Sequence, residues 1–502
     1  MTIRNLANLA GAHPLGAGRV APFIGLCLAL ALGLSGCRST PVYTAPKGPV
    51  QGACLRPTTN KDLLIGLAVS GGGSRAALYA AGAFEALAQI RVGPEGRSLM
   101  EQVSFISSVS GGSLASAYYV LNKPAREIPV LTAAGELTEP YQKFFEDFRG
   151  TMAHDFEGAL LRHQLFRWRW FNPAWMAKSL QEILASEDYL GPGTFAELAR
   201  REARGDSPRL LVNTTLYNDG RRLVVSTLPR DESRYDLMAD MARVPGDDLL
   251  RQRYADLLHA EWNSLQSASL QDLNLDACHS LVSSAVAASM SAPPVIGPIS
   301  LRVEDEDQYW HIGDGALSDN TGAESLLMLA LKKLQDGTAQ RALLLVIDSG
   351  FPFEVGSEVL NQRKEGFSLF SYDFSRIPGI QEERSMAYRT LFLGIAQIQG
   401  ILPDRDRIVV MSLRHTDAQW KQDVSDLPDS CADQNILWKS AHKIKRHLAG
   451  IITRLWLESP CDRDLILRAA AKVVVQNEEA IRTFLEAEPS DTLTRGTSGA
   501  NP

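Results

Sequence analysis

The feature that most constrains the fold is an apolar run that ends at a serine followed by two glycines. The run covers residues 103–109, Ser110 stands at its end, and Gly111 and Gly112 open a small-residue helical pattern. This order predicts a strand, a tight turn with the serine at its apex, and a helix. Such a turn holds the serine hydroxyl clear of the sheet, beside the positive end of the helix. Taken alone, the pattern fits a serine that caps an ordinary buried helix equally well.

The two elbow positions that flank the serine are Ser108 and Gly112, in the spacing of G-x-S-x-G with a serine in the first glycine position. Glycine suits such positions because the backbone there is strained and the helix passes close to the strand. Both residues are small, so we expect the turn to close.

A second glycine-rich loop comes earlier in the chain. Gly71, Gly72 and Gly73 follow an apolar run over 63–69 and precede a small-residue helical pattern. Consecutive glycines at a helix N-terminus can turn their N–H groups toward one point and bind an anion, either a phosphate or the oxyanion of an acyl-transfer intermediate. Arg75 adds a fixed positive charge nearby. The spacing matches neither a G-x-x-x-x-G-K loop nor a G-x-G-x-x-G loop.

The third motif places Asp314 between Gly313 and Gly315, directly after a short strand pattern over 309–312. An Asp-Gly pair is common in ordinary turns. With a serine elbow and a glycine loop in the same chain, however, Asp314 becomes a candidate general base.

Together, the motifs at 71–75, 108–112 and 314–316 resemble the patatin-like phospholipase family. The family has, in this order, a glycine-rich oxyanion loop with a basic residue, G-x-S-x-G, and D-G-[GA]. The small-residue segment 285–294 and the hairpin pattern over 210–226 are similar as well, so the resemblance covers roughly 62–350. It implies an α/β fold of three layers, with a mostly parallel central sheet, helices on both faces and helical insertions.

The resemblance also implies an activity. Ser110 and Asp314 would form a catalytic dyad without histidine that hydrolyses phospholipids or related lipid esters. Gly71, Gly72 and Gly73 would form the oxyanion hole, with Arg75 fixing the loop. The resemblance implies no cofactor, and carboxylates are not clustered at metal-ligand spacing, so we expect no metal site and no calcium.

Two alternatives stay open at this point. A Ser-His-Asp triad would need one of the histidines near or after the aspartate, which are His279, His311, His415, His442 and His447. The second alternative is a catalytically weak, lipid-anchored protein that binds acyl chains or a partner in a retained pocket. It is motivated by Ser108 and by Ala76, which follows Arg75 where the family usually has glycine.

The first 36 residues read as a signal peptide, with Arg4 and Arg19 before or at the start of an apolar run over 20–34. The run ends in Leu-Ser-Gly-Cys, which resembles the bacterial lipoprotein box. By that resemblance Cys37 is acylated and anchors the protein to a membrane of the bacterial cell envelope, most simply the outer membrane. Membrane lipid is then both substrate and anchor surface.

The remainder of the chain is expected to have three parts. A flexible tether covers 37–61, the α/β hydrolase domain covers 62–485 with helical insertions at about 138–204 and 230–276 and a helical C-terminal part, and a disordered tail covers 486–502. The aromatic residues of 138–204 favour core packing over a lipid-facing lid. The net charge of −7 gives no indication of nucleic-acid binding.

Four cysteines lie beyond Cys37. Cys431 and Cys461 flank an expected helix and could pair in an oxidising compartment. Connectivity cannot be deduced from sequence, so we expect Cys54, Cys278, Cys431 and Cys461 to be buried free thiols.

Overall fold

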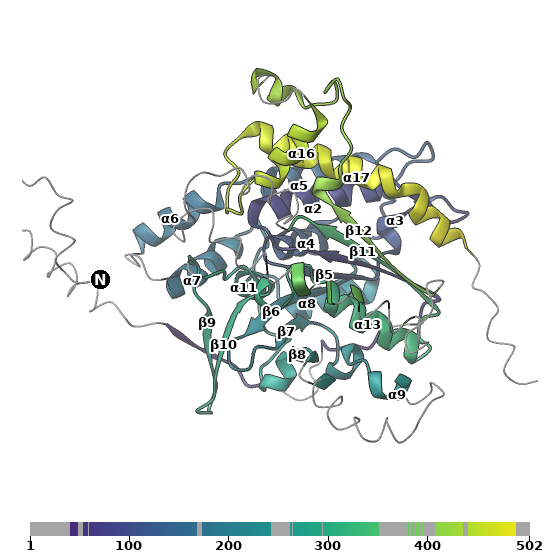
Figure 1. Ribbon diagram of the computed structural model, residues 1–502. Coiled ribbons are helices and arrows are strands. Elements are labelled where there is room, and N and C mark those ends of the chain that lie inside the picture. Colours follow the sequence, from purple (N-terminus) through teal and green to yellow (C-terminus); the bar gives the residue numbers. More distant parts are fainter. Residues whose placement is uncertain are drawn as a thin grey trace, which may run out of the picture.

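The computed structural model describes residues 41–48, 54–58, 60–167, 173–241, 262–263, 265–293, 295–350, separate positions between 380 and 397, 407–434 and 440–487 (Figure 1). The signal peptide, Cys37 and the tail from 488 onward lie outside these residues, and those expectations stay predictions. No helix among the described residues is both long and apolar enough to cross a bilayer.

A large mixed sheet forms the centre of the fold. Its parallel part has, in spatial order, β6 (Arg209–Leu216), β5 (Phe105–Val109), β2 (Leu63–Val69), β11 (Arg341–Asp348) and β12 (Ile408–Arg414). Beyond β6 the sheet continues with β10 (Tyr309–Asp314), β9 (Ile299–Val303) and β1 (Val42–Ala45), while β7 (Arg222–Ser226) and β8 (Ala268–Ser269) branch from β6.

The central strands are apolar along their whole length because both faces of the sheet are covered. In β2, Ile65 and Leu67 pack into the core on one face, whereas Leu64 and Ala68 pack into the core on the other. Successive side chains of a strand point to opposite faces. Gly66 leaves room on the second face for Leu326 of the covering helix.

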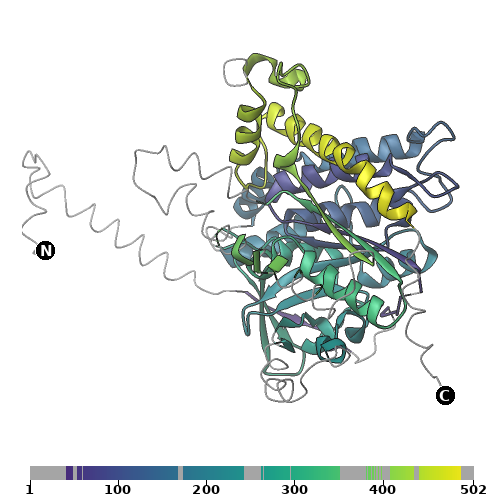
Figure 2. The same ribbon diagram turned by 45° about the vertical axis from the view of Figure 1, so that its right-hand side comes forward.

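Helices lie on both faces of the sheet (Figures 1 and 2). On one face are α2 (Gly73–Ala88), α4 (Gly111–Asn122), α5 (Glu139–Met152) and α17 (Pro460–Glu486), with α2 packed against the other three. On the opposite face α13 (Ala323–Gln335) packs against β2, β5 and β11. The expected three-layer α/β fold is therefore confirmed.

The other described elements connect these layers or flank them. The short strands are β3 (Arg91–Val92) and β4 (Arg97–Ser98). The remaining α-helices are α3 (Leu99–Gln102), α6 (Phe156–Phe166), α7 (Pro173–Leu184), α8 (Phe195–Arg204), α9 (Leu237–Met241), α11 (Val282–Ser289), α12 (Ala316–Asp319) and α16 (Ala441–Gly450). The 3₁₀ turns are η2 (Arg230–Ser233), η3 (Leu270–Leu273), η5 (His415–Asp417) and η6 (Asp429–Gln434).

The aromatic helices follow the core-packing expectation in part. In α5, Phe144 and Phe148 stack against Tyr118 of α4, and Phe145 is fully buried. Phe166, the last residue of α6, is instead 79% exposed. The aromatic core therefore comes from α2, α4 and α5, because Phe84 of α2 contacts the rings of Tyr119 and Phe148. Helix α6 contributes its first residue, Phe156, which is buried.

The expected flexible tether over 37–61 is wrong for the residues that the structure describes. Val42–Ala45 form β1, which pairs in parallel with β9 at the edge of the sheet. Alternating intermediate and exposed side chains in β1 explain why no apolar periodicity marks it in the sequence.

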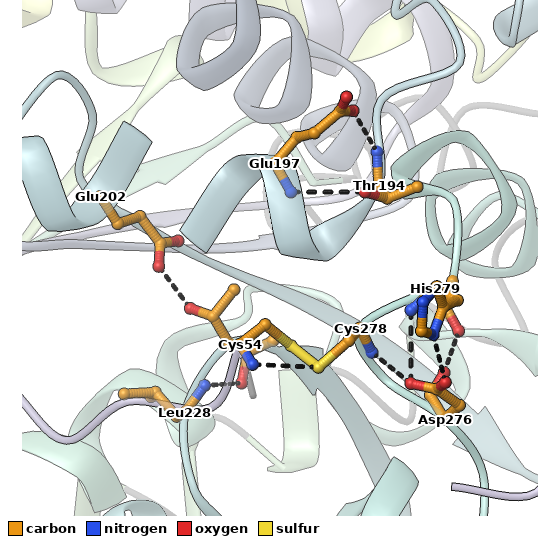
Figure 3. Close-up of a disulfide and its surroundings, with 11 residues drawn as sticks. Cys54, Thr194, Glu197, Glu202, Leu228, Asp276, Cys278 and His279 are labelled. Carbon is orange, nitrogen blue, oxygen red and sulfur yellow. Dashed lines mark hydrogen bonds and ion pairs between the residues drawn. A yellow bond between two sulfur atoms is a disulfide. The ribbon is translucent and has the colours of Figure 1, made fainter. Parts of the chain in front are cut away.

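The expectation of free thiols is also wrong, because all four cysteines are paired. One disulfide joins Cys54 to Cys278 and the other joins Cys431 to Cys461. Figure 3 shows the first bond beside Asp276, whose carboxylate accepts a hydrogen bond from the Cys278 N–H at 2.8 Å. This disulfide fastens the segment before β2 to the turn that leads into α11.

We predict that replacing both Cys54 and Cys278 with serine lowers the free energy of unfolding by about 2 to 4 kcal/mol, because the bond closes a loop of more than two hundred residues in the unfolded chain. Urea unfolding followed by circular dichroism measures the change. Wild-type protein treated with a reductant should also unfold at a lower urea concentration. An unchanged urea midpoint in the double variant would contradict the prediction.

Candidate active site

The predicted strand, turn and helix are present around Ser110. Strand β5 ends at Val109, Ser110 has φ 50° and ψ −124°, and α4 begins at Gly111. A positive φ is rare for a residue other than glycine and costs about 1 to 3 kcal/mol. The Ser110 N–H donates to Ser289 Oγ at 2.8 Å, which helps to hold this backbone in place.

The glycines after Ser110 are required by close backbone contact. A Cβ atom on Gly111 would lie 2.0 Å from the carbonyl oxygen of Gly73, and one on Gly112 would lie 2.5 Å from that of Ser70. The N-termini of α4 and α2 therefore touch through bare backbone. On the strand side, the buried Ser108 side chain donates to the Leu211 carbonyl at 3.3 Å, so a serine fits the first elbow position.

Two strands that meet end to end bring the serine and the aspartate together. Along one edge of β6, β5 ends with Val109 opposite Asn213, and β10 ends with Asp314 opposite Thr214, the next residue. Strand β7 occupies the other edge. Ser110 Oγ consequently donates to Asp314 Oδ2 at 2.9 Å.

The Asp314 carboxyl is fixed and buried. Its Oδ1 accepts a hydrogen bond from the Ala316 N–H at 2.8 Å, and its backbone carbonyl accepts one from Thr215 Oγ1, also at 2.8 Å. Burial raises the pKa of Asp314 to about 7, although the hydrogen bonds from Ala316 and Ser110 act in the opposite direction. A carboxyl with this pKa can both accept and return a proton near neutral pH.

The glycine loop lies next to Ser110, with two of its N–H groups available. Gly71 donates its N–H to the Asn320 carbonyl at 2.8 Å, so that group is already used, contrary to the expected role of Gly71 in an oxyanion hole. Within the described part of the chain, the N–H groups of Gly72 and Gly73 have no hydrogen-bond acceptor. Their φ values of 142° and 60° favour glycine.

Arg75 is buried under the loop and anchors it. Its Nε donates to the Ser349 carbonyl at 3.0 Å, and its terminal nitrogens donate to the carbonyl of Ile451 and, at 3.3 Å, to Thr453 Oγ1. The guanidinium group thus joins the loop to the end of β11 and to the segment between α16 and α17. This arrangement matches the loop-fixing role expected for Arg75.

The sequence motifs did not indicate that the segment between α16 and α17 belongs to the site. The carbonyl of Arg454 accepts the Ser74 N–H at 2.8 Å and fills the space where a side chain on Gly73 would lie. The Arg454 guanidinium group binds both carboxylate oxygens of Glu157 on α6, at 2.7 and 3.2 Å. Ser289 and Asn320 were missed as well, although Asn320 stands shortly after the Asp-Gly-Ala motif.

Four of the five candidate histidines for a triad are engaged elsewhere, and the fifth, His442, is exposed on α16. In the described part of the chain, the only side chain that binds Ser110 Oγ is Asp314. His279 contacts Asp276, His311 contacts Ser300 Oγ at 2.9 Å, and His447 contacts Asp462 at 2.6 Å. His415 is fully buried beside the carbonyl of Asp348, and burial, reinforced by the charge of Arg75, lowers its pKa to about 3. A neutral histidine with this pKa is a poor general base.

A family model described as patatin-like phospholipase matches residues 67–327, just over half of the chain. None of the curated proteins compared with the chain matches it. Among solved structures, human GIVD cytosolic phospholipase A2 is similar, with 12% identity, a TM-score of 0.41, and coverage of 84% of this chain and 60% of that chain. VipD from Legionella pneumophila is similar with 10% identity, a TM-score of 0.30, and coverage of 86% and 70%.

We predict that Gly111→Ala destabilises the protein by about 2 kcal/mol or more, because the new methyl group would overlap the Gly73 carbonyl oxygen. Gly150→Ala in α5 is the matched control. It places a methyl group in open space and should stabilise the helix by up to about 1 kcal/mol. Thermal unfolding compares the melting temperatures of the two variants. Equal values would contradict the contact between the N-termini of α2 and α4.

We predict that Asp314→Asn is more stable than wild type at pH 8 and equally stable near pH 4. The folded carboxyl, with a pKa of about 7, keeps a proton that the unfolded chain loses near 3.8, so wild-type stability falls as pH rises through this range. The difference between the variant and wild type should grow from pH 4 to pH 7, toward an upper limit of about 4 kcal/mol. A difference that does not change with pH would contradict the prediction.

Proposed function

Because the chain belongs to the patatin-like phospholipase family, we propose that it hydrolyses ester bonds of lipids with Ser110 as nucleophile and Asp314 as general base. The observation that carries this proposal is the hydrogen bond of 2.9 Å from Ser110 Oγ to Asp314 Oδ2. A free alcohol is a weak nucleophile and needs a base in direct contact.

In the proposed reaction, Asp314 takes the hydroxyl proton while Ser110 Oγ forms a bond to the ester carbonyl carbon. The tetrahedral intermediate then loses the alcohol, which leaves with the proton held by Asp314, and an acyl-serine remains. Water attacks this acyl group and gives its proton to Asp314. Release of the fatty acid returns that proton to Ser110.

The oxyanion of both tetrahedral intermediates would be stabilised by the N–H groups of Gly72 and Gly73. These groups lie at the N-terminus of α2, where the helix dipole favours negative charge. Arg75 supports this role indirectly. Its side chain donates hydrogen bonds to Ser349 and Thr453 and so fixes the position of the loop.

Ser108 and Ala76 motivated the alternative of a catalytically weak binding protein, but both residues fit the structure without disturbing the site. Ser108 is hydrogen bonded and Ala76 is buried inside α2. Neither residue separates Ser110 from Asp314, so the hydrolase is the better-supported function.

We also propose that the protein acts in the bacterial cell envelope, anchored through an acylated Cys37. Two disulfides support an oxidising compartment outside the cytoplasm, in agreement with the signal-peptide pattern. An anchor in the outer membrane would hold the enzyme at a surface made of its proposed substrates, the membrane lipids.

The test of the function is product analysis on mixed phospholipids and triglycerides by mass spectrometry. Ser110→Ala and Asp314→Asn should each lower fatty-acid release at least about a thousandfold with folding retained. Ser425→Ala, at an exposed serine, and His415→Ala are the controls and should keep activity. Full activity in folded Ser110→Ala would overturn the proposal, and selective loss in His415→Ala would replace the dyad with a triad.

The proposed base also predicts a pH profile. Asp314 must be ionised to accept the proton of Ser110, so kcat/KM should rise about tenfold per pH unit below pH 7 and level off above it. A soluble ester and a constant ionic strength keep substrate binding the same across the series. Activity that falls from pH 5 to pH 7 would contradict the role of Asp314.

A further inference from the structure

A cavity lies at the amino-terminal ends of the central strands, whereas Ser110 lies at their carboxyl ends. It has a volume of about 1100 Å³ and is lined by Lys61, Ser104 and Arg209, which stand at the amino-terminal ends of β2, β5 and β6. The dyad lies at the carboxyl ends, roughly 20 Å away by the length of β2 at about 3.3 Å per residue. The two sites are therefore distinct.

The cavity is lined by an excess of positive charge. Some of its cations have carboxylate partners: Arg204 pairs with Asp206 at 2.6 Å, and Lys333 pairs with Glu232. Among the described residues, no carboxylate lies within ion-pair distance of the side chains in a second group, which consists of Arg56, Lys61, Lys123 and Arg126.

Two lysines of this second group bind neutral oxygen atoms, which stabilise a positive charge less than an anion does. Lys61 Nζ binds Ser104 Oγ at 3.1 Å, and Lys123 Nζ binds the carbonyl of the adjacent Pro124 at 3.3 Å. Burial and the nearby Arg201 lower the pKa of Lys123 to about 8. Burial raises the pKa of Glu202, a carboxyl in the cavity wall, to about 7, so this group is only partly ionised near neutral pH.

Several polar atoms of the cavity wall also lack partners. Ser207 Oγ, Arg91 Nε and Glu202 Oε1 are buried without a hydrogen-bond partner among the described residues. The Ser207 residue is only 8% exposed. These atoms are buried within the wall and are not exposed to the cavity, so they are not counted among the groups that would bind a ligand.

We propose that this cavity binds a phosphate-bearing anion, either a free phosphate ester or the headgroup of a phospholipid. A phosphate carries more than one negative charge and several acceptor oxygens. It can therefore bind more than one cation of the second group, and Lys61 and Arg126 lie close enough for their charges to repel each other. The volume leaves room for an ester substituent beyond the phosphate.

The test is calorimetric titration of the full-length protein with glycerol 3-phosphate, inorganic phosphate and uncharged glycerol at constant ionic strength. Both phosphates should bind, and glycerol should not. Lys61→Gln with Arg126→Gln should weaken phosphate binding about tenfold or more. Lys421→Gln, which removes an exposed charge elsewhere, is the control and should bind as wild type does.

Vesicle flotation distinguishes the two sources of phosphate. The protein carrying Ser110→Ala is mixed with phosphatidylcholine vesicles that contain or lack phosphatidic acid. Binding that depends on phosphatidic acid and on Lys61 and Arg126 assigns the site to a headgroup, whereas binding only to glycerol 3-phosphate assigns it to a free ester.

Two results would overturn the proposal. One is no binding of either phosphate in solution or on vesicles. The other is binding that Lys421→Gln weakens as much as the double variant does, which would indicate a general charge effect.

Discussion

The site depends on two strands that end against each other on one edge of β6. Strand β5 arrives from one direction and β10 from the other, and their last residues face consecutive positions of β6. This register, rather than any loop, sets the distance between Ser110 and Asp314. An interior strand of a sheet is a rigid support, which suits a pair of groups that must stay within hydrogen-bond distance.

Around this support the site is built from backbone contacts and buried hydroxyl groups. Ser289 connects the elbow to β6 by accepting from the Ser110 N–H and donating to the Asn213 carbonyl at 2.6 Å. The Asn213 amide binds Ser107 Oγ and the Ser108 carbonyl, both at 2.9 Å. These bonds satisfy polar groups in a dry interior, and they keep the strained backbone of Ser110 in one conformation.

Much of this arrangement could be predicted from local sequence, because the elbow, the glycine loop and the Asp-Gly turn each combine a strand pattern with glycine. The anion-binding role of Gly71 could not be judged, since its N–H is taken by Asn320 from a distant part of the chain. β1 and the disulfide between Cys54 and Cys278 were missed for a related reason, and the pairing of Cys431 with Cys461 was only one of the alternatives. Pairing between segments such as Cys54 and Cys278 depends on the three-dimensional fold, and neither residue type nor spacing specifies it.

The contacts of Arg75 and Ser74 with residues 451–454 link the glycine loop to a segment that is made late in synthesis. Until this segment has folded against α2, the loop lacks the groups that hold its backbone. A partly synthesised chain would therefore contain the serine and the aspartate without a rigid glycine loop beside them. Such an order of assembly would keep the proposed hydrolase inactive until this segment has been made and has folded.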